Sequence, residues 1–282
     1  MSGYALPSIY RPTARDVERI GRAGRGEWKE WLRRQSPERV RRWLDADSKA
    51  EVLEASFVAE RAKSSSSAST STISSGSYSG VTVGNLLVFI VGYGVDTFNV
   101  SRDYSSVSDT GSNIWTLATH AATGNQATGV GIAVVFSVAA SATGNVTVTL
   151  NGATPISALK LEEFSGTAAS SVHDASNSNG GNASASSGTT PSVTAAKAGE
   201  LAVSGWVMGA AESSFTVGGS YTQAGTTVNG APAIDIACEY LLSASAGAQT
   251  ASGSWATAAG WASSLSFFNV TAAAAAATGC FQ

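Results

Sequence analysis

The sequence predicts a mainly β protein: an antiparallel sandwich of two sheets, built from two sequence repeats and preceded by a small α-helical N-terminal segment. Three observations predict it. The first is composition, because only 13% of the 282 residues are charged and the polar remainder is dominated by Gly, Ser and Thr, which favours strands and turns over helices. The second is an abrupt change of charge along the chain, and the third is an internal repeat.

Charged residues are concentrated in the first 63 positions. This segment holds 14 of the 17 Lys and Arg and 10 of the 20 Asp and Glu, a net charge of +4, whereas residues 64–282 hold 3 and 10, a net charge of −7. A basic head is therefore joined to a nearly uncharged, mildly acidic body. Acidic residues alternate with the basic ones of the head and weaken the field that phosphate binding needs, so nucleic acid is not an expected partner.

The basic head, residues 1–63, has the caps and the spacing of short amphipathic helices. Thr13 and Ser36 are predicted N-caps, and a last helix is predicted from about Ser48 with Phe57 on its apolar side. Short helices need their apolar side covered, and Trp is a residue type that dominates interfaces, so the alternatives are a private core and docking on a partner protein. The residues expected at the docking surface are Trp28, Trp31, Leu32, Val40, Trp43 and Leu44.

Beyond residue 64 the sequence repeats itself at nearly constant offsets. The matched blocks are Gly84–Val88 with Gly199–Val203 at an offset of 115, and Ile132–Phe136 with Ile236–Tyr240 at an offset of 104. The second offset also relates Leu161 to Leu265, which are expected to be equivalent core positions. The offset changes within 94–110, a stretch rich in Gly, Ser and Asp that is expected to be a loop.

Each repeat is expected to contribute about six strands. The predicted strands are 68–80, 86–93, 114–120, 131–139, 145–150 and 156–164 in the first copy, and 184–195, 200–209, 221–228, 235–243, 248–257 and 260–269 in the second. The strand at 156–164 carries apolar residues on both faces or contains a bulge. Strands of the two copies are expected to interleave in both sheets, which gives a jelly-roll-like body.

The expected organisation follows the charge change and the repeat. The segments are the α-helical basic anchor at 1–63, a Ser-rich linker at 64–80 that runs into the first strand, repeat 1 at 68–165, an inter-repeat loop at 166–182, repeat 2 at 183–270 and a C-terminal tail at 271–282. Met1–Tyr10 lacks the apolar stretch of a signal peptide, and the run Leu86 to Val95 is about half a membrane span. A protein made in the cytoplasm, with no membrane partner, is expected.

Three runs of the body carry a family resemblance. They are GNLLV at 84–88, VSDTGSNIWTLA at 107–118 and EEFSGTA at 162–168. They resemble the β-sandwich modules of virion proteins from tailed bacteriophages and of some bacterial surface proteins, over roughly residues 68–270. The resemblance implies a non-enzymatic structural or adhesive module and brings no catalytic residue with it. Docking by the head is inferred from its own residues.

Side chains able to carry catalysis are few and scattered. The chain has two histidines: His120 is expected near a strand end, and His173 in the inter-repeat loop. Glu162 and Glu163 are adjacent on a strand, so they point to opposite faces and cannot flank one glycosidic bond. No catalytic residue, cofactor or metal ligand set is expected, and the protein is not expected to be an enzyme.

Two alternatives remain open at this stage. Asp96, Asp103 and Asp109 share the long loop of the first repeat and are either solvated acids or a Ca²⁺ site, although their spacing does not fit an EF-hand. Cys238 is expected to be a buried, small apolar side chain, and Cys280 to be a free thiol or an intersubunit disulfide.

The family resemblance of the body and the Trp-bearing basic head together predict a virion structural protein of a tailed phage, assembled in the host cytoplasm. The helices would dock on capsid, portal or tail proteins, and the projecting sandwich would decorate the particle, as a head fibre or tail protein does, or contact the host surface; a homo-oligomer is expected. The alternative is a carbohydrate-binding cell-surface or adhesion module. In either case a host surface glycan is a possible partner if aromatic rings are exposed. The aromatic residues expected at such a contact surface are Tyr93, Phe98, Tyr104 and Tyr221.

Overall fold

The computed structural model describes residues 55–94, 101–123, 129–210, 214–226, 228–230 and 234–271. These residues form antiparallel β-sheets, which confirms the mainly β class for this part of the chain. No helix in these ranges has the length and apolar character needed to cross a membrane. The predicted docking residues, Trp28, Trp31, Leu32, Val40, Trp43 and Leu44, lie outside the described residues, as does Cys280.

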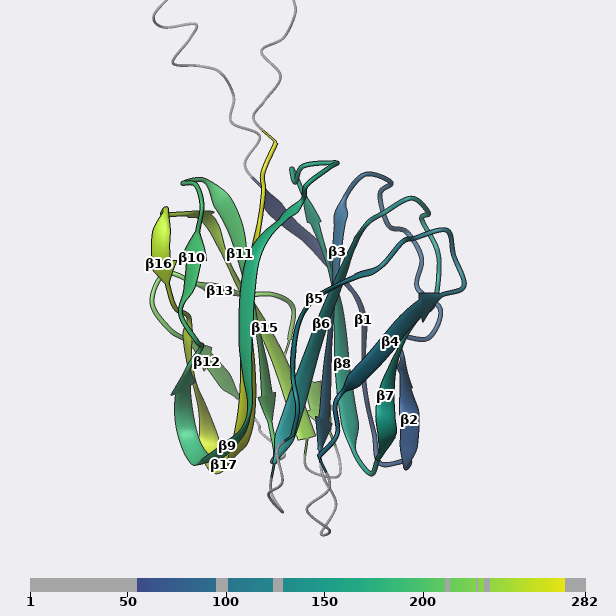
Figure 1. The fold of residues 1–282 in the computed structure, drawn as a ribbon, viewed down its shortest axis with the longest axis vertical. Coiled ribbons are helices and arrows are strands. Elements are labelled where there is room, and N and C mark those ends of the chain that lie inside the picture. Colours follow the sequence, from purple (N-terminus) through teal and green to yellow (C-terminus); the bar gives the residue numbers. More distant parts are fainter. Residues whose placement is uncertain are drawn as a thin grey trace, which may run out of the picture. The chain divides into compact units, whose positions relative to one another are not determined.

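The described residues of the first half of the body form eight strands in two sheets. Their bounds are β1 Ser56–Ser66, β2 Thr70–Ser74, β3 Leu86–Gly94, β4 Tyr104–Asp109, β5 Thr116–Ala121, β6 Val130–Val138, β7 Val146–Thr154 and β8 Ser157–Ser165. The sheet of order β1-β8-β3-β6-β5 is called inner sheet 1, and the sheet of order β2-β7-β4 is called outer sheet 1. Figure 1 shows both sheets at the right of the molecule.

The second half of the body contains the remaining strands. Their bounds are β9 His173–Thr189, β10 Val193–Ala195, β11 Glu200–Met208, β12 Phe215–Val217, β13 Thr222–Gln223, β14 Val228–Gly230, β15 Ile234–Ala244, β16 Gly247–Gln249 and β17 Ser252–Phe268. Inner sheet 2 has the path β12-β17-β11-β15-β13, with β9 paired to β17 and β14 paired to β15. β10 and β16 form a separate two-stranded ribbon.

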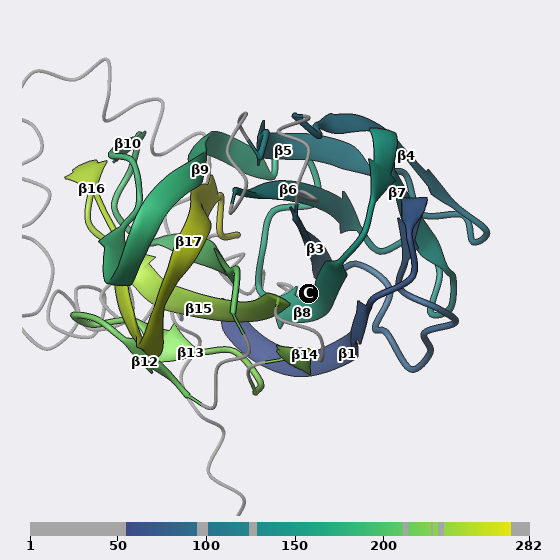
Figure 2. The ribbon, with the colours of Figure 1, turned by 90° about the horizontal axis from the view of Figure 1, so that it is seen from below.

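Three apolar cores lie between these layers. A central core separates the two inner sheets, and each inner sheet has an outer core on its other face. Even-numbered residues of β3 from Leu86 to Ile90 enter the central core, and its odd-numbered residues from Leu87 to Tyr93 enter the first outer core. A strand buried on both faces needs apolar residues at successive positions, which explains the long apolar run. Figure 2 shows the two inner sheets facing each other, with β5 beside β9.

The two inner sheets have corresponding strand orders and registers. Inner sheet 1 has the order β1-β8-β3-β6-β5, and strand by strand this corresponds to the order β9-β17-β11-β15-β13 in inner sheet 2. The corresponding residue pairs are Leu86 with Phe164 and Leu201 with Phe268, and Leu87 with Ser137 and Ala202 with Leu241. They are related by the offsets of 115 and 104 residues found in the sequence.

Three local predictions are wrong. Ser56–Ser66 is β1 and not part of a helix that reaches residue 63, because it pairs along β8 and Phe57 packs on the ring of Tyr240 at 5.6 Å. β9 begins at His173, inside the predicted loop 166–182, because it lies along β17. β4 lies in the stretch 94–110 that was expected to be a loop, because it pairs with β7.

The predicted interleaving of strands from the two copies is also wrong. Every sheet formed by the described residues takes its strands from one half only, the first half ending with β8 and the second beginning with β9. The physical reason is that β3 and β11 are apolar on both faces, so each needs a covering layer on both sides. The four sheets together provide these covering layers. A sandwich of only two sheets would leave one apolar face of each sheet in water.

Candidate functional site

The four aromatic residues predicted at the surface lie in different environments. Tyr93 is fully buried and its hydroxyl donates to the carbonyl oxygen of Ala121 at 3.2 Å, so a surface role for it is wrong. Phe98 lies outside the described residues. Tyr221 is half-buried, and burial of its hydroxyl raises the pKa of that group. Tyr104 is half-exposed at the start of β4.

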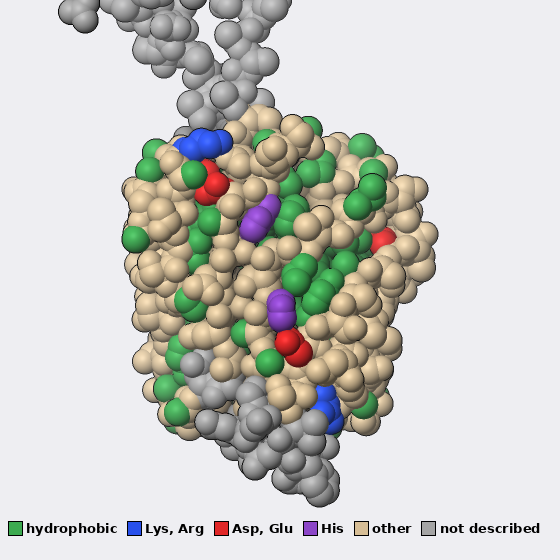
Figure 3. Space-filling view, viewed as in Figure 1, with side chains coloured by type: hydrophobic (Ala, Val, Ile, Leu, Met, Phe, Trp, Pro, Cys, Tyr) green, Lys and Arg blue, Asp and Glu red, His purple; other side chains and the backbone are tan. Residues whose placement is uncertain are grey.

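Tyr104 lies on an open side of the first half, where β4, the edge of outer sheet 1, faces β5, the edge of inner sheet 1. Four half-buried apolar side chains line this side and are called the edge strip: Tyr104, Val107, Trp115 and Leu117. Trp115 is fixed by edge-on packing against Phe89, with ring centroids 6.3 Å apart. Figure 3 shows apolar side chains gathered beside the lower of the two histidines on this face.

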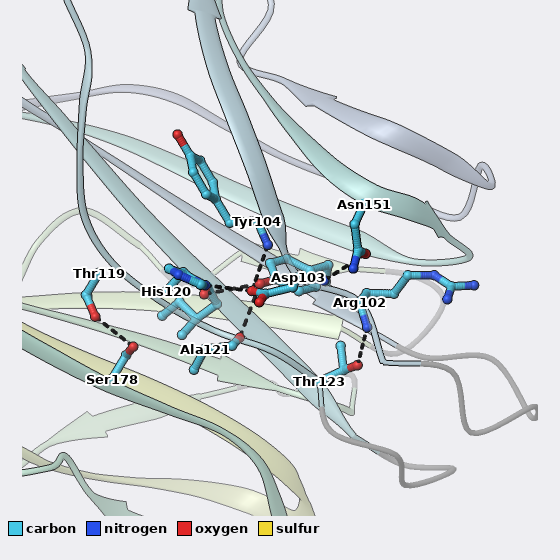
Figure 4. Close-up of polar contacts among 11 residues, drawn as sticks. Arg102, Asp103, Tyr104, Thr119, His120, Ala121, Thr123, Asn151 and Ser178 are labelled. Carbon is cyan, nitrogen blue, oxygen red and sulfur yellow. Dashed lines mark hydrogen bonds and ion pairs between the residues drawn. The ribbon is translucent and has the colours of Figure 1, made fainter.

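A polar cluster adjoins the edge strip at Tyr104. Asp103 Oδ1 accepts hydrogen bonds from His120 Nδ1 at 2.6 Å and from the backbone nitrogen of Tyr104 at 2.8 Å, as Figure 4 shows. The backbone nitrogen of Asp103 donates to Asn151 Oδ1 at 3.1 Å. The His120 ring lies 5.7 Å from the Tyr104 ring, and its side chain is 38% exposed. The cluster therefore presents an aromatic ring together with oriented polar groups.

Asp109, one of the three acids considered for Ca²⁺, is used inside the protein. Its donors are Tyr78 Oη at 2.8 Å, Trp115 Nε1 at 2.7 Å, the backbone nitrogen of Gly111 at 2.8 Å and that of Asn145 at 3.0 Å. Burial opposes ionisation, but these hydrogen bonds outweigh it and hold the pKa of Asp109 below its usual range. Asp96 lies outside the described residues, which contain no group of three or more His, Cys, Asp or Glu placed to hold a metal ion.

A second polar cluster, which the sequence reasoning missed, is buried where the two halves meet. Lys160 of β8 is fully buried, and its Nζ lies 2.8 Å from Glu60 Oε2 and 3.0 Å from Glu162 Oε1. The same Nζ donates to the carbonyl oxygens of Ala224 at 2.8 Å and Thr226 at 2.7 Å. Because these carbonyl groups belong to the second half, this Lys160 cluster fastens the two halves together.

The pKa values of Lys160 and of its partner Glu162 are both shifted upwards. Burial opposes the charge of Lys160, but the negative charges of Glu162 and Glu60 hold its pKa above the usual range. Burial raises the pKa of Glu162 to about 7, although Lys160 opposes this shift. Cys238 is fully buried, which confirms its predicted role as a small apolar side chain, and burial raises the pKa of its thiol. A thiol held protonated is a poor nucleophile.

The neighbouring carboxylate faces the other way, as predicted for adjacent strand positions. Glu163 is fully buried on the outer side of β8, where it forms an ion pair with Arg61. Its Oε1 accepts hydrogen bonds from the backbone nitrogen of Thr82 at 3.0 Å and from Asn85 Nδ2 at 2.5 Å. Glu162 and Glu163 therefore serve separate structural contacts.

His173 lies on β9 and packs between aromatic rings. Its ring stacks on Phe136 at 5.2 Å and meets Phe268 edge-on at 5.7 Å. Burial lowers the pKa of His173. This environment fits a neutral packing residue that links β6 to inner sheet 2.

No family model, curated protein or solved structure matches this chain. The geometry defines a layered β protein. It has a half-exposed aromatic and polar edge in the first half and a buried ionic cluster between the halves.

Proposed function

We propose that this chain is a non-enzymatic structural protein of a tailed-phage virion. Its body projects from the particle, and its helical head docks on capsid, portal or tail proteins. The observation that carries the proposal is that charged groups of the body serve the fold itself: Lys160, Glu162 and Glu163 are buried in structural contacts. The remaining surface is rich in small hydroxyl side chains, which lose little conformational entropy when they pack in an assembly.

The body is proposed to be a tandem duplication of one sandwich-forming unit. The matching strand orders of the inner sheets support this, since independent sheets have many possible orders. The matching registers support it further, because a slip of one residue would turn every side chain to the other face. The chain is proposed to be assembled in the host cytoplasm and to act as a homo-oligomer in the virion.

The alternative is a carbohydrate-binding adhesion module. The observation that favours it is the pairing of the half-exposed Tyr104 ring with Asp103 and His120 on an open edge of the first half. The two proposals are compatible, because a projecting virion protein that contacts the host surface needs such an edge.

Particle incorporation tests the proposed function. The double variant Trp31→Ala, Trp43→Ala should be lost from purified particles of the parent phage, because two aromatic anchors at an interface are worth roughly 3 kcal/mol or more. The control is Tyr104→Ala, whose change lies on the body and should leave incorporation unaltered. Normal incorporation of the double variant would show that the docking assignment is wrong.

A further inference from the structure

We propose that the edge strip and the polar cluster beside it form a binding site for an uncharged saccharide chain. The proposal rests on the proposed role of the body in contacting a host surface, and it names the ligand of that contact. It is carried by the junction of Tyr104 with Asp103, His120 and Asn151 at one end of the strip.

The aromatic part of the site is held in one position. Tyr104 is anchored through its backbone nitrogen to Asp103, and the His120 ring lies against it at 5.7 Å. A half-exposed ring that does not have to be ordered on binding offers its apolar face at low entropic cost. The C–H face of a sugar ring is apolar and flat enough to lie on such a surface.

The polar part of the site has unused hydrogen-bonding capacity that faces the same edge. Asp103 uses Oδ1 for its hydrogen bonds to Tyr104 and His120, and among the described residues Oδ2 has no hydrogen-bond partner. Because His120 Nδ1 contacts Asp103, the Nε2 on the other side of the ring is the nitrogen left to meet a ligand hydroxyl. Asn151 uses its side-chain oxygen and keeps its NH₂ group as a donor. A carboxylate oxygen, a ring nitrogen and an amide donor beside an aromatic ring match the neighbouring hydroxyl groups of a sugar, each of which can donate and accept.

The extent and the charge of the surface specify the ligand class. Val107 on β4, Trp115 just before β5 and Leu117 on β5 continue the apolar surface beyond Tyr104. Tyr104 and Val107 lie about 7 Å apart along the strand, because they face Leu150 and Val148, two residues apart on β7. The strip therefore extends past a single sugar ring. Near the polar cluster, Asp103 is accompanied by Arg102, whose Nε donates to the carbonyl oxygen of Ala153. One acid and one base leave little net charge, so an uncharged chain is favoured over a sulfated one.

Binding of defined oligosaccharides by the full-length protein tests the proposal. The probes are immobilised hexasaccharides of glucose, mannose, galactose and N-acetylglucosamine, with a sulfated hexasaccharide for comparison. At least one uncharged probe should bind, and Tyr104→Ala and Asp103→Asn should each weaken its binding by about tenfold or more, equivalent to about 1.4 kcal/mol. Tyr104→Phe keeps the ring and should bind within about threefold of the unaltered protein.

The control is Tyr221→Ala, which removes a half-buried aromatic residue of the second half and should leave binding unchanged. Failure of every uncharged probe at about 10 mM, binding of the sulfated probe alone, or equal binding by Tyr104→Ala would each overturn the saccharide proposal. Thermal unfolding of each variant shows that it is folded. Incorporation into particles is measured separately, so a failed binding experiment with normal incorporation would leave the virion proposal standing.

Discussion

Replacing Lys160 by Met removes the ammonium group that fastens the two halves of the body and keeps a side chain of similar length. Lys160 and Glu162 are fully buried, and the side chain of Glu60 is only 17% exposed. The substitution leaves two carboxylates facing each other without their shared cation. It also removes the donor to the carbonyl oxygens of Ala224 and Thr226.

The expected cost is large and depends on pH. Removing one partner of a buried ion pair costs about 3–5 kcal/mol, because the remaining charge stays in a poorly solvated place. Glu162 can escape this penalty by taking up a proton, and burial already raises its pKa to about 7. Lys160→Met should therefore lower the free energy of unfolding by about 3–5 kcal/mol at pH 8 and by clearly less at pH 5.5.

Urea unfolding followed by tryptophan fluorescence at the two pH values measures this effect. The matched control is Lys197→Met, because Lys197 is exposed and its amine donates to Asn269 at the surface. The control should change the free energy of unfolding by no more than about 0.5 kcal/mol. The reasoning is refuted if Lys160→Met is as mild as the control at pH 8, or if its cost is the same at both pH values.

Three further predictions concern the cores and the pH dependence. Leu161→Ala and Leu265→Ala remove fully buried side chains at matched positions, so each should cost about 2–5 kcal/mol in urea unfolding. The raised pKa of Glu162 means that the folded state holds more protons than the unfolded state between pH 4.5 and about 7. Glu162 should therefore contribute a fall in stability of up to about 3 kcal/mol as pH rises through this window, and Glu162→Gln should remove that part of the fall, while Glu239, whose pKa burial also raises to about 7, keeps its own part. Gly92→Ala should cost about 1–3 kcal/mol, because its Cβ would lie 2.7 Å from Val207 across the central core.

Each of these predictions has a result that contradicts it. A negligible cost for one leucine variant beside a large cost for the other would argue against equivalent core positions. Stability that rises between pH 5 and pH 7 in the unaltered protein, with no change of profile in the Glu162 variant, would show that the carboxyl group titrates in its ordinary range. A neutral Gly92→Ala variant would show that the inner sheets are not in close contact there.

Residue composition and turn signals made much of the fold predictable. The structure confirms strands close to those predicted at 86–93, 131–139, 156–164 and 200–209, because these segments combine β-branched and aromatic residues with turn signals at both ends. The first part of β9, up to residue 183, was missed because it is rich in Ser, Asn and Gly, and its strand geometry comes from pairing with β17. The local sequence carries no signal for a strand whose conformation comes from pairing with a distant strand.

The sites were less predictable than the strands. Tyr104 was predicted as a surface aromatic from composition, but its partnership with His120 needs β4 and β5 to come together across two sheets. Lys160 and Glu162 alternate with apolar residues on β8, a pattern that usually marks a solvent-facing side. The second half of the chain covers that side, which only the tertiary structure shows.

Quantitative mass spectrometry of purified particles tests the central claim, that a positively charged head holds a structural β body on a virion. The comparison is between the full-length chain and a chain that lacks residues 1–54, a deletion that stops before β1 because Ser56–Ser66 belongs to the body. The full-length chain should be present in particles and the truncated chain absent, although it is folded and expressed. Equal amounts of both chains in the particles, or absence of the full-length chain from them, would contradict the claim.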